Sequence, residues 1–529
     1  MSEAAGAGPA PGAAQSHDAA RAIAARLSAM LQHDHILVPI AAVSEALESI
    51  AHIDLALLAS EIMKRRTATA GISIITSDEL RSIAQSLRAE KVPLPMPVEV
   101  QRSYGARPAA MEYHAEYKIN GRQSHRVSGT VEDFVHYFRS RLERLRAMLA
   151  RRESTAGIVS RLDSISGYMD GRSVGVAGMV SSKSITKNGN LMLVLEDEYA
   201  EARVIFMNWQ GEKQRSIFQS ASMALNDEVI AVRGHMYHGM VMADDVLFPD
   251  VPMTQMPAVE EEIAIAFVSD LHIGSKLFME DRFMHMLNWL GGASSADRDG
   301  PGGLAGKIKY IVIAGDVADG VGVYPNQERE LSITDIYGQY RVFTSLLESI
   351  PDYIHVFVAP GNHDAVRLAE PQPRLGEELV GECGMDNVHF IDNPCHMTLH
   401  GIDVLAYHGA SLDPIIASVP GMSYSAPEKA MVEALKRRHL SPIYGSNPIL
   451  PTQEDTLVID RVPHILNMGH EHRCGIASYH GVYAVNSGTW QSRTQYQVSL
   501  GHVPTPCIMP VYDARKCAFT MVNFNSVVA

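Results

Sequence analysis

The 529-residue chain is 46% hydrophobic and 20% charged, a balance typical of soluble proteins with folded cores. Its length predicts two to four domains of roughly 100–200 residues each. The formal net charge of -15, from 45 basic and 60 acidic residues, argues against a protein that coats nucleic acid by bulk positive charge. Residues 1–170 carry 20 basic and 19 acidic residues, so the acidic excess lies after residue 170.

The cysteines and the hydropathy of the chain indicate in which cellular compartment the protein is expected. The five cysteines contain no C-x-x-C pair, which argues against a disulfide framework or a zinc ribbon and favours a reducing environment. No apolar run approaches the ~20 residues of a membrane helix, and the chain has neither a basic residue before Arg21 nor the apolar run of a signal peptide. We therefore expect a cytoplasmic protein with no membrane partner.

Three regions precede residue 171. Residues 1–18 are dominated by Ala, Gly, Pro and Ser and are predicted to form a disordered tail. Apolar residues recur at helical spacing over 19–90, which predicts a small helical domain. Residues 91–170 are predicted to be a linker followed by an arginine-rich helix over 131–152. The basic face of that helix is either a solvated surface or a patch for nucleic acid or an acidic partner.

Short β-rich runs separated by turns fill residues 171–255 and predict a small closed barrel of the OB-fold type. Its aromatic residues could contact bases or belong to the barrel core; they are Phe206, Trp209, Phe218 and Tyr237. From 256 to 529, strand-like runs alternate with helical or loop stretches, which predicts a layered α/β domain with a buried sheet. Those runs are 263–268, 310–314, 354–358, 388–391, 403–407 and 465–468.

Five segments of the α/β region share one design, in which an apolar run ends in metal-binding side chains. They are FVSDLHIG at 267–274, IAGDVAD at 313–319, APGNHD at 359–364, AYHG at 406–409 and MGHEH at 468–472. In an open α/β sheet such groups gather beyond the carboxyl ends of the strands. Imidazole with carboxylate suits Mn, Zn or Fe better than Mg, and two such ions can hold a phosphate. A single segment, such as Tyr407-His408, is more often structural, whereas all five in this order indicate phosphate chemistry.

The order of these motifs resembles the calcineurin-like metallophosphoesterase superfamily over about residues 256–500. The resemblance implies a layered β-sandwich flanked by helices, with two metal sites that share one aspartate. It assigns Asp270, His272, Asp316 and His472 to one ion, and Asp316, Asn362, His408 and His470 to the other. His363 would be the proton donor or transition-state stabiliser, and Asp364 would orient it.

A barrel directly before a phosphoesterase domain is the arrangement of replicative polymerase B-subunits. Three further stretches and the arginine-rich helix resemble the small subunits of archaeal D-family DNA polymerases over about residues 130–520. The stretches are LKRRHLSPIYG at 435–445, VIDRVP at 458–463 and NSGTWQ at 486–491.

This second resemblance implies a metal-dependent 3′→5′ exonuclease that proofreads by removing mismatched nucleotides, and a scaffold for a separate large catalytic subunit. The implied cofactors are two divalent ions, Mn first, with Mg, Fe or Zn as alternatives. The implied partners are the large subunit, a DNA 3′ end and, as a further option, a sliding clamp, in the cytoplasm at the nucleoid.

The basic stretch Lys436, Arg437, Arg438 and His439 has two interpretations. It is either an exposed helix end or a clamp on single-stranded DNA near the ions, where arginine contacts phosphate. Further candidates for DNA contact are Trp490, Gln491 and Arg493, because an aromatic side chain can stack on a frayed base.

Three other functions stay open. A free-standing DNA repair nuclease is disfavoured because about 268 residues precede the first ligand motif. A non-catalytic scaffold, as in the eukaryotic B-subunits, is disfavoured because no expected ligand is replaced. A small-molecule or protein phosphatase would leave the barrel unexplained.

Overall fold

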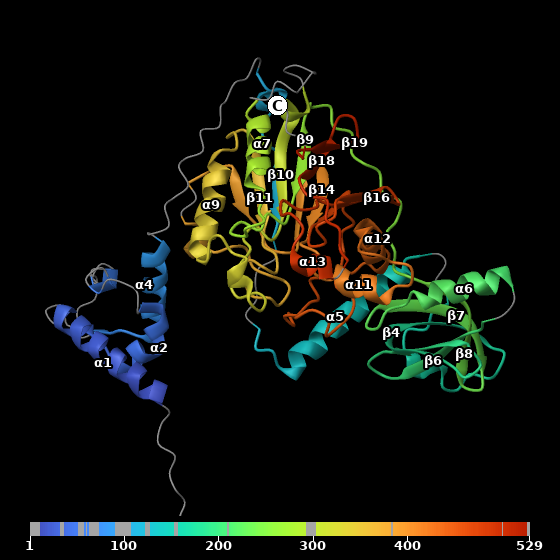
Figure 1. The fold of residues 1–529 in the computed structure, drawn as a ribbon. Helices are drawn as coiled ribbons and strands as arrows, with labels where there is room; N and C mark the ends of the chain where they lie inside the picture. Colours follow the sequence, from blue (N-terminus) through green and yellow to red (C-terminus); the bar gives the residue numbers. More distant parts are fainter. Residues whose placement is uncertain are drawn as a thin grey trace, which may run out of the picture. The chain divides into compact units, whose positions relative to one another are not determined.

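The computed structural model describes residues 11–31, 36–50, 55, 58–59, 61–62, 73–89, 107–121, 127–152, 157–208, 211–292, 303–381, 384–499 and 501–525 (Figure 1). The backbone divides into two compact units. One comprises residues 1–97 with 333–342, and the other residues 98–332 with 343–529. Within the described ranges, no helix combines the length and the apolar character that crossing a bilayer requires.

The first unit is built mainly from helices, as expected for residues 19–90. Its elements are α1 (Pro11–Leu31), β1 (Ile36–Leu37), α2 (Ile40–Ile50), β2 (Ser73–Ile74) and α4 (Ser77–Ala89). Leu27, Val43 and Leu80 are fully buried in its core.

Two features of this unit differ from the sequence prediction. The helix α1 begins at Pro11, inside the expected tail, because its alanine-rich start favours a helix and proline is tolerated in the first turn. Residues 1–10 of that tail lie outside the described residues. In addition, the short strands β1 and β2 pair in parallel.

Part of the predicted linker belongs to a sheet. After the 3₁₀ turn η2 (Ala109–Glu112), the strand β3 (Tyr117–Asn120) pairs antiparallel with β13 (Cys395–Leu399). The linker prediction was therefore wrong for this stretch. The reason is that β3 has four residues with mostly exposed side chains and so lacks the alternation that marks a half-buried strand.

The predicted arginine-rich helix is α5 (Val131–Ala150). It begins with a capping box in which the side chains of Thr130 and Asp133 each accept a hydrogen bond from the backbone amide of the other. Its inner face buries Leu142, Leu145 and Leu149 against the barrel strands.

The β-rich region forms a closed five-stranded barrel with the order β4-β5-β6-β8-β7. Its elements are β4 (Ser173–Ile185), β5 (Leu191–Glu196), β6 (Glu201–Phe206), α6 (Glu212–Ser222), β7 (Val229–Tyr237) and β8 (Met240–Leu247). Leu191, Leu193 and Leu195 of β5 point inward and are fully buried. A closed barrel of five strands is compatible with the predicted OB-fold. The assignment to the OB-fold itself stays a prediction. Phe206 belongs to the barrel core, whereas Trp209 lies outside the described residues.

The other strands form two six-stranded sheets, with the orders β12-β11-β10-β9-β18-β19 and β16-β17-β15-β14-β13-β3. The first contains β9 (Ala264–Val268), β10 (Ile308–Ala314), β11 (His355–Ala359), β12 (Val388–Phe390), β18 (Ile508–Asp513) and β19 (Ala518–Asn523). The second adds β14 (Ile402–Ala406), β15 (Ile465–Met468), β16 (Gly475–Tyr479) and β17 (Val482–Asn486). The six runs predicted from the sequence fall on β9, β10, β11, β12, β14 and β15, so these strands are confirmed.

The two sheets pack face to face. Phe267 and Phe357 of the first sheet share one core with Val404 and Ile465 of the second. The helices α11 (Leu412–Ser418) and α12 (Pro427–Arg437) pack on the second sheet in a separate cluster. The remaining helical segments are η4 (Leu162–Ile165), α7 (Glu280–Leu290), α8 (Leu304–Lys307), η6 (Gln327–Arg329), α9 (Ile336–Glu348), α10 (Glu377–Val380) and α13 (Gln495–Ser499). The α/β region is thus the layered sandwich that was expected.

Candidate metal centre

In all five motif segments, the metal-binding side chains come shortly after the end of a strand. The strands β9, β10 and β11 run parallel in the first sheet, and β14 and β15 run parallel in the second. Because the carboxyl ends of parallel strands meet at one edge, the side chains that follow them converge. The structure brings together all seven residues predicted as ligands, which we call the metal centre: Asp270, His272, Asp316, Asn362, His408, His470 and His472.

The backbone of the metal centre is held in an unusual conformation. Five of its residues have left-handed φ values: Asp270 (52°), His272 (52°), Asp316 (51°), His470 (69°) and His472 (55°). For residues other than glycine this conformation costs on the order of 1–3 kcal/mol each, and such strain concentrates at functional sites. The neighbouring Gly361 is needed because a Cβ atom there would collide with the Asp316 carboxylate.

The first predicted ligand group is compact. His272 Nε2 lies 3.0 Å from His472 Nε2 and 3.8 Å from Asp316 Oδ2. His472 Nε2 lies 3.5 Å from Asp270 Oδ1. These four side chains are all at least nine-tenths buried. They could hold one divalent cation.

The second group shares Asp316 with the first. His408 Nε2 lies 3.3 Å from Asp316 Oδ2 and 2.8 Å from Asn362 Oδ1. His470 Nδ1 lies 3.0 Å from the same Asn362 oxygen. One aspartate is therefore common to two donor sets, as a bridging ligand requires.

The hydrogen bonds around the histidines test whether this donor set fits metal ions. His272 Nδ1 lies 3.0 Å from Asp319 Oδ1, and His408 Nδ1 lies 2.9 Å from the Ala314 carbonyl oxygen. Because each outer nitrogen donates to an oxygen, each Nε2 presents a lone pair toward the centre. The Nε2 lone pairs of His272 and His408 then face carboxylate and amide oxygens. Because these electron-rich atoms repel one another, the arrangement is stable only with a positive charge between them. The residues present therefore fit divalent ions.

The pKa values of His408 and Asp316 also indicate that positive charge is favoured in the metal centre. Burial by itself would lower the pKa of His408, but the Asp316 carboxylate raises it to about 10. Burial opposes ionisation of Asp316, yet His408 and His363 hold its pKa well below the ordinary value. A cation bound here would take the place of protons on the histidines, so binding should release protons.

His363 lies at the edge of the metal centre and is partly exposed to the cleft. Its Nδ1 donates a hydrogen bond to the Asp319 carbonyl oxygen at 2.8 Å, and its backbone amide donates to Asp316 Oδ1 at 2.8 Å. Because Nδ1 is engaged in this way, Nε2 is the ring nitrogen of His363 that can contact a substrate.

Asp364 differs from its predicted role of orienting His363. Its carboxylate accepts hydrogen bonds from the backbone amides of Gly361 (2.8 Å) and Ala318 (3.1 Å). It therefore ties the loop after β11 to the loop after β10. The group bound to the His363 ring is the Asp319 carbonyl oxygen instead.

The predicted DNA clamp is wrong for three of its residues because they are buried and paired. Arg437, Arg438 and His439 are 2%, 6% and 1% exposed. Arg437 Nε lies 2.6 Å from Glu228 Oε2 of the barrel, and Arg437 also pairs with Glu433. Lys436, which is partly exposed, pairs with Glu433 as well.

The partners of Arg438 and His439 are also internal. Arg438 donates to the carbonyl oxygens of Ile459 and Asp460, each at 2.7 Å. His439 Nε2 lies 2.8 Å from Asp455 Oδ2, which also binds Arg141 of α5 at 2.6 Å. We call the set Arg141, Glu228, Glu433, Arg437, His439 and Asp455 the interface cluster, because it joins α5, the barrel and the α/β sandwich.

Trp490 is likewise a core residue rather than a DNA contact. It is 1% exposed and packs against Phe283 and Phe524, with ring centroids 5.0 and 5.7 Å away. Gln491 is buried and donates to Asp319 Oδ1 at 3.2 Å. Arg493 is exposed, so its contact with DNA stays a prediction.

The sequence reasoning missed several residues beside the metal centre. Asp319 binds the rings of both His272 and His363, and its place three residues after Asp316 in the same motif was an available signal. Asp413 Oδ2 lies 3.1 Å from His470 Nε2, but it comes from α11, where no motif marks it.

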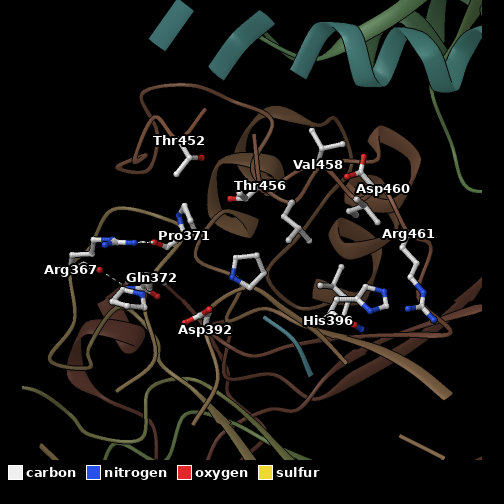
Figure 2. Close-up of a pocket in the computed structure, with 16 residues that line it drawn as sticks. Arg367, Pro371, Gln372, Asp392, His396, Thr452, Thr456, Val458, Asp460 and Arg461 are labelled. Carbon is white, nitrogen blue, oxygen red and sulfur yellow. Dashed lines mark hydrogen bonds between the residues drawn. The ribbon is translucent and has the colours of Figure 1, made fainter. Parts of the chain in front are cut away.

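A cleft of about 780 Å³ opens over the metal centre and is lined by five of its residues: His272, Asp316, Asn362, His470 and His472. Figure 2 shows a different, smaller cavity of about 190 Å³ near Pro371, Asp392 and Val458. None of the predicted ligands lines that second cavity. The cleft is therefore the candidate site.

Sequence comparisons connect the chain to known proteins. The family of the DNA polymerase alpha/epsilon B-subunits matches residues 265–474. The chain is 42% identical over 396 residues to the DNA polymerase II small subunit of Archaeoglobus fulgidus, covering 74% of this chain and 77% of that protein. It is 39% identical over 412 residues to the one of Methanocaldococcus jannaschii (77% and 68%) and 37% identical over 408 residues to the one of Methanothermobacter thermautotrophicus (77% and 82%).

Among solved structures, an archaeal phosphodiesterase aligns at 12% identity with a TM-score of 0.25, covering 49% of this chain and 99% of its own. The relationship to known proteins is thus carried by sequence, over about three quarters of the chain.

Proposed function

The chain belongs to the family of DNA polymerase II small subunits, and we propose that it supplies a metal-dependent 3′→5′ exonuclease to such a polymerase. One observation carries the proposal: the seven donor groups converge without a substitution, and Asp316 is common to both donor sets. A subunit that served only as a scaffold would not need strained backbone at five of these residues.

The proposed roles follow from the contacts. Asp270, His272, Asp316 and His472 would hold one ion, and Asp316, Asn362, His408 and His470 the other. When bound, the ions would supply charge stabilisation of the phosphodiester and a lowered pKa for a water molecule. His363 would stabilise or protonate the departing group through Nε2, while the Asp319 carbonyl keeps its ring in place.

The ligand chemistry favours a particular class of ion. Four imidazoles with two carboxylates and one amide suit Mn, Fe or Zn, whereas Mg prefers carboxylate and water. We propose two Mn²⁺ ions, with Fe, Zn and Mg as alternatives.

The proposed partners are a large polymerase subunit and a DNA 3′ end, with a sliding clamp as a further option. The relatives are named small subunits, which implies a large one. The net charge of -15 predicts weak binding of DNA by this chain alone, so a firm grip on duplex DNA would come from the partner.

A direct experiment uses a primer–template with a 3′ mismatch and Mn²⁺, with the full chain alone and with its large subunit. We expect metal-dependent removal of the mismatched nucleotide that is lost in Asp316→Asn and strongly reduced in His363→Ala. Asp352→Asn, at an exposed aspartate outside the cleft, is the matched control and should keep full activity. Failure of the wild-type chain to degrade the primer, alone and in the complex, would favour the scaffold function instead.

A further inference from the structure

The charges in the cleft do not favour a nucleic acid backbone. Besides the metal centre, the cleft is lined by the acids Asp319, Asp413 and Glu471. In the part of the chain that the structure describes, neither lysine nor arginine lines it. Beyond a phosphate held by the ions, a substrate must therefore be recognised by contacts other than ion pairs with basic side chains.

Aromatic side chains supply such contacts. Tyr324, Tyr424, Tyr496 and His502 all line the cleft. The Tyr424 ring lies 4.2 Å from the His502 ring, centroid to centroid, and burial together with the nearby Asp413 carboxylate raises the pKa of its hydroxyl. The Tyr324 hydroxyl donates to Glu330 at 3.1 Å. Tyr324 is thus held by a hydrogen bond, and Tyr424 by contact with a second ring.

Tyr496 is the most accessible of these rings. It is 70% exposed although it lines the cleft, an unusual degree of exposure for a large aromatic side chain. It lies on α13, whose next residue, Gln497, has its side-chain amide 2.8 Å from His472 Nδ1. Gln497 Oε1 in turn accepts from the Thr494 amide at 3.1 Å. The helix that carries Tyr496 is therefore anchored to a residue of the metal centre.

We propose that Tyr496, with Tyr424, stacks on the terminal base of a single-stranded DNA 3′ end while the adjacent phosphodiester lies at the metal centre. This inference rests on the proposed exonuclease function. Stacking on an aromatic ring tolerates any base because every base has a π-face, and it contributes roughly 1–3 kcal/mol per base.

The same contact selects unpaired ends. A base at the end of a matched duplex is paired and stacked on its neighbour, and freeing it costs a few kcal/mol, whereas a mismatched base is freed at a lower cost. A cleft that binds the base through its faces would therefore accept mismatched and single-stranded ends ahead of matched duplex ends.

The test for stacking uses an oligonucleotide with 2-aminopurine at its 3′ end and a hydrolysis-resistant terminal phosphorothioate linkage. With the full chain and Mn²⁺, stacking quenches 2-aminopurine fluorescence. We expect quenching with the wild type and with Tyr496→Phe, and its loss with Tyr496→Ala. Tyr199→Ala is the matched control, since Tyr199 is 53% exposed and lies outside the cleft. Unchanged quenching by Tyr496→Ala, or none by the wild type, would overturn the inference.

A second measurement compares hydrolysis of oligonucleotides that end in a normal or in an abasic nucleotide. Tyr496→Ala should lower kcat/KM roughly 5- to 100-fold for the normal end and leave the abasic end unchanged. Equal losses on both substrates would contradict stacking. Hydrolysis of neither substrate by the wild type would overturn the proposed exonuclease, and the fluorescence result would still decide whether Tyr496 binds the base.

Discussion

The chain buries two clusters of charged residues that differ in how their charge is balanced. In the metal centre, Asp270 and Asp316 have only histidines as ion-pair partners within the described residues. In the interface cluster, the acids Glu228, Glu433 and Asp455 each contact an arginine. The first cluster is left in need of a cation, whereas every acid of the second already contacts a guanidinium group.

The two clusters also differ in backbone conformation. Five residues of the metal centre have left-handed φ values, and none of the six residues of the interface cluster does. Strain of this kind persists only where surrounding structure imposes it, and it is typical of functional sites. The comparison teaches that buried charge alone does not identify a functional site. Buried acids that lack an arginine or lysine partner and lie on strained backbone are the better indication.

The largest effect is expected from Asp316→Asn, which removes the ligand common to both donor sets. We expect kcat for 3′ nucleotide removal to fall roughly 10³-fold, the equivalent of several kcal/mol of transition-state stabilisation. The free energy of unfolding without metal should fall less than in the interface-cluster variant below, because the amide loses the ion pair with His408 but keeps the oxygen that accepts from the His363 backbone amide. Urea unfolding and a primer-degradation assay measure the two quantities. A loss of stability as large as the one expected below for Asp455→Ala would weaken the distinction between the clusters.

The opposite pattern is expected from Asp455→Ala in the interface cluster. It leaves Arg141 and His439 buried without their carboxylate, which should lower the free energy of unfolding by about 3–5 kcal/mol. The control is Glu198→Ala, which breaks the partly exposed pair with Arg139 and should cost at most ~1 kcal/mol. Similar losses in the two variants would show that burial does not distinguish these pairs.

A pH dependence of stability should arise from His439. Burial and the nearby Arg141 lower the pKa of His439 to about 4, and its Nδ1 accepts a hydrogen bond from the Ser441 amide at 3.0 Å. In the unfolded chain a histidine titrates near ~6.5, so between pH ~6.5 and ~4 the unfolded state binds a proton that the folded state does not. The free energy of unfolding should therefore decrease as pH falls through this window, by up to ~1.4 kcal/mol per pH unit.

The measurement is urea unfolding at several pH values between 7 and 4. His439→Gln has no titrating ring and should show a shallower decrease than the wild type over the same window. Identical slopes in the two proteins would rule out His439 as the source.

A smaller effect is expected at the edge of the metal centre. Asp413 orients His470 through a 3.1 Å contact, and loss of such a supporting carboxylate commonly weakens metal binding about 10- to 100-fold. Asp413→Asn should lower Mn²⁺ affinity by such a factor in isothermal titration calorimetry, with Asp352→Asn as the unaffected control. Unchanged affinity would mean that His470 does not depend on Asp413 for its orientation.

Much of the fold and of the candidate site could be predicted because the signals were local. Six apolar runs became strands, and the residues directly after five of them, such as Asp270 and His408, meet at the metal centre. The strand β3 escaped prediction because its pairing with β13 involves residues far away in the chain. The supporting residue Asp413 was missed for the same reason.

The identity and order of the metal-binding side chains could be read from the chain, since each lies beside the strand that positions it. The fate of Arg437, Arg438 and His439 could not, because burial depends on partners such as Glu228 and Asp455 that only folding brings near. A basic run has the same appearance in a sequence whether it faces solvent or a buried carboxylate. Tertiary structure alone decided that the acidic chain keeps these basic side chains inside, between barrel and sandwich, and leaves the cleft to the metal centre and the tyrosines.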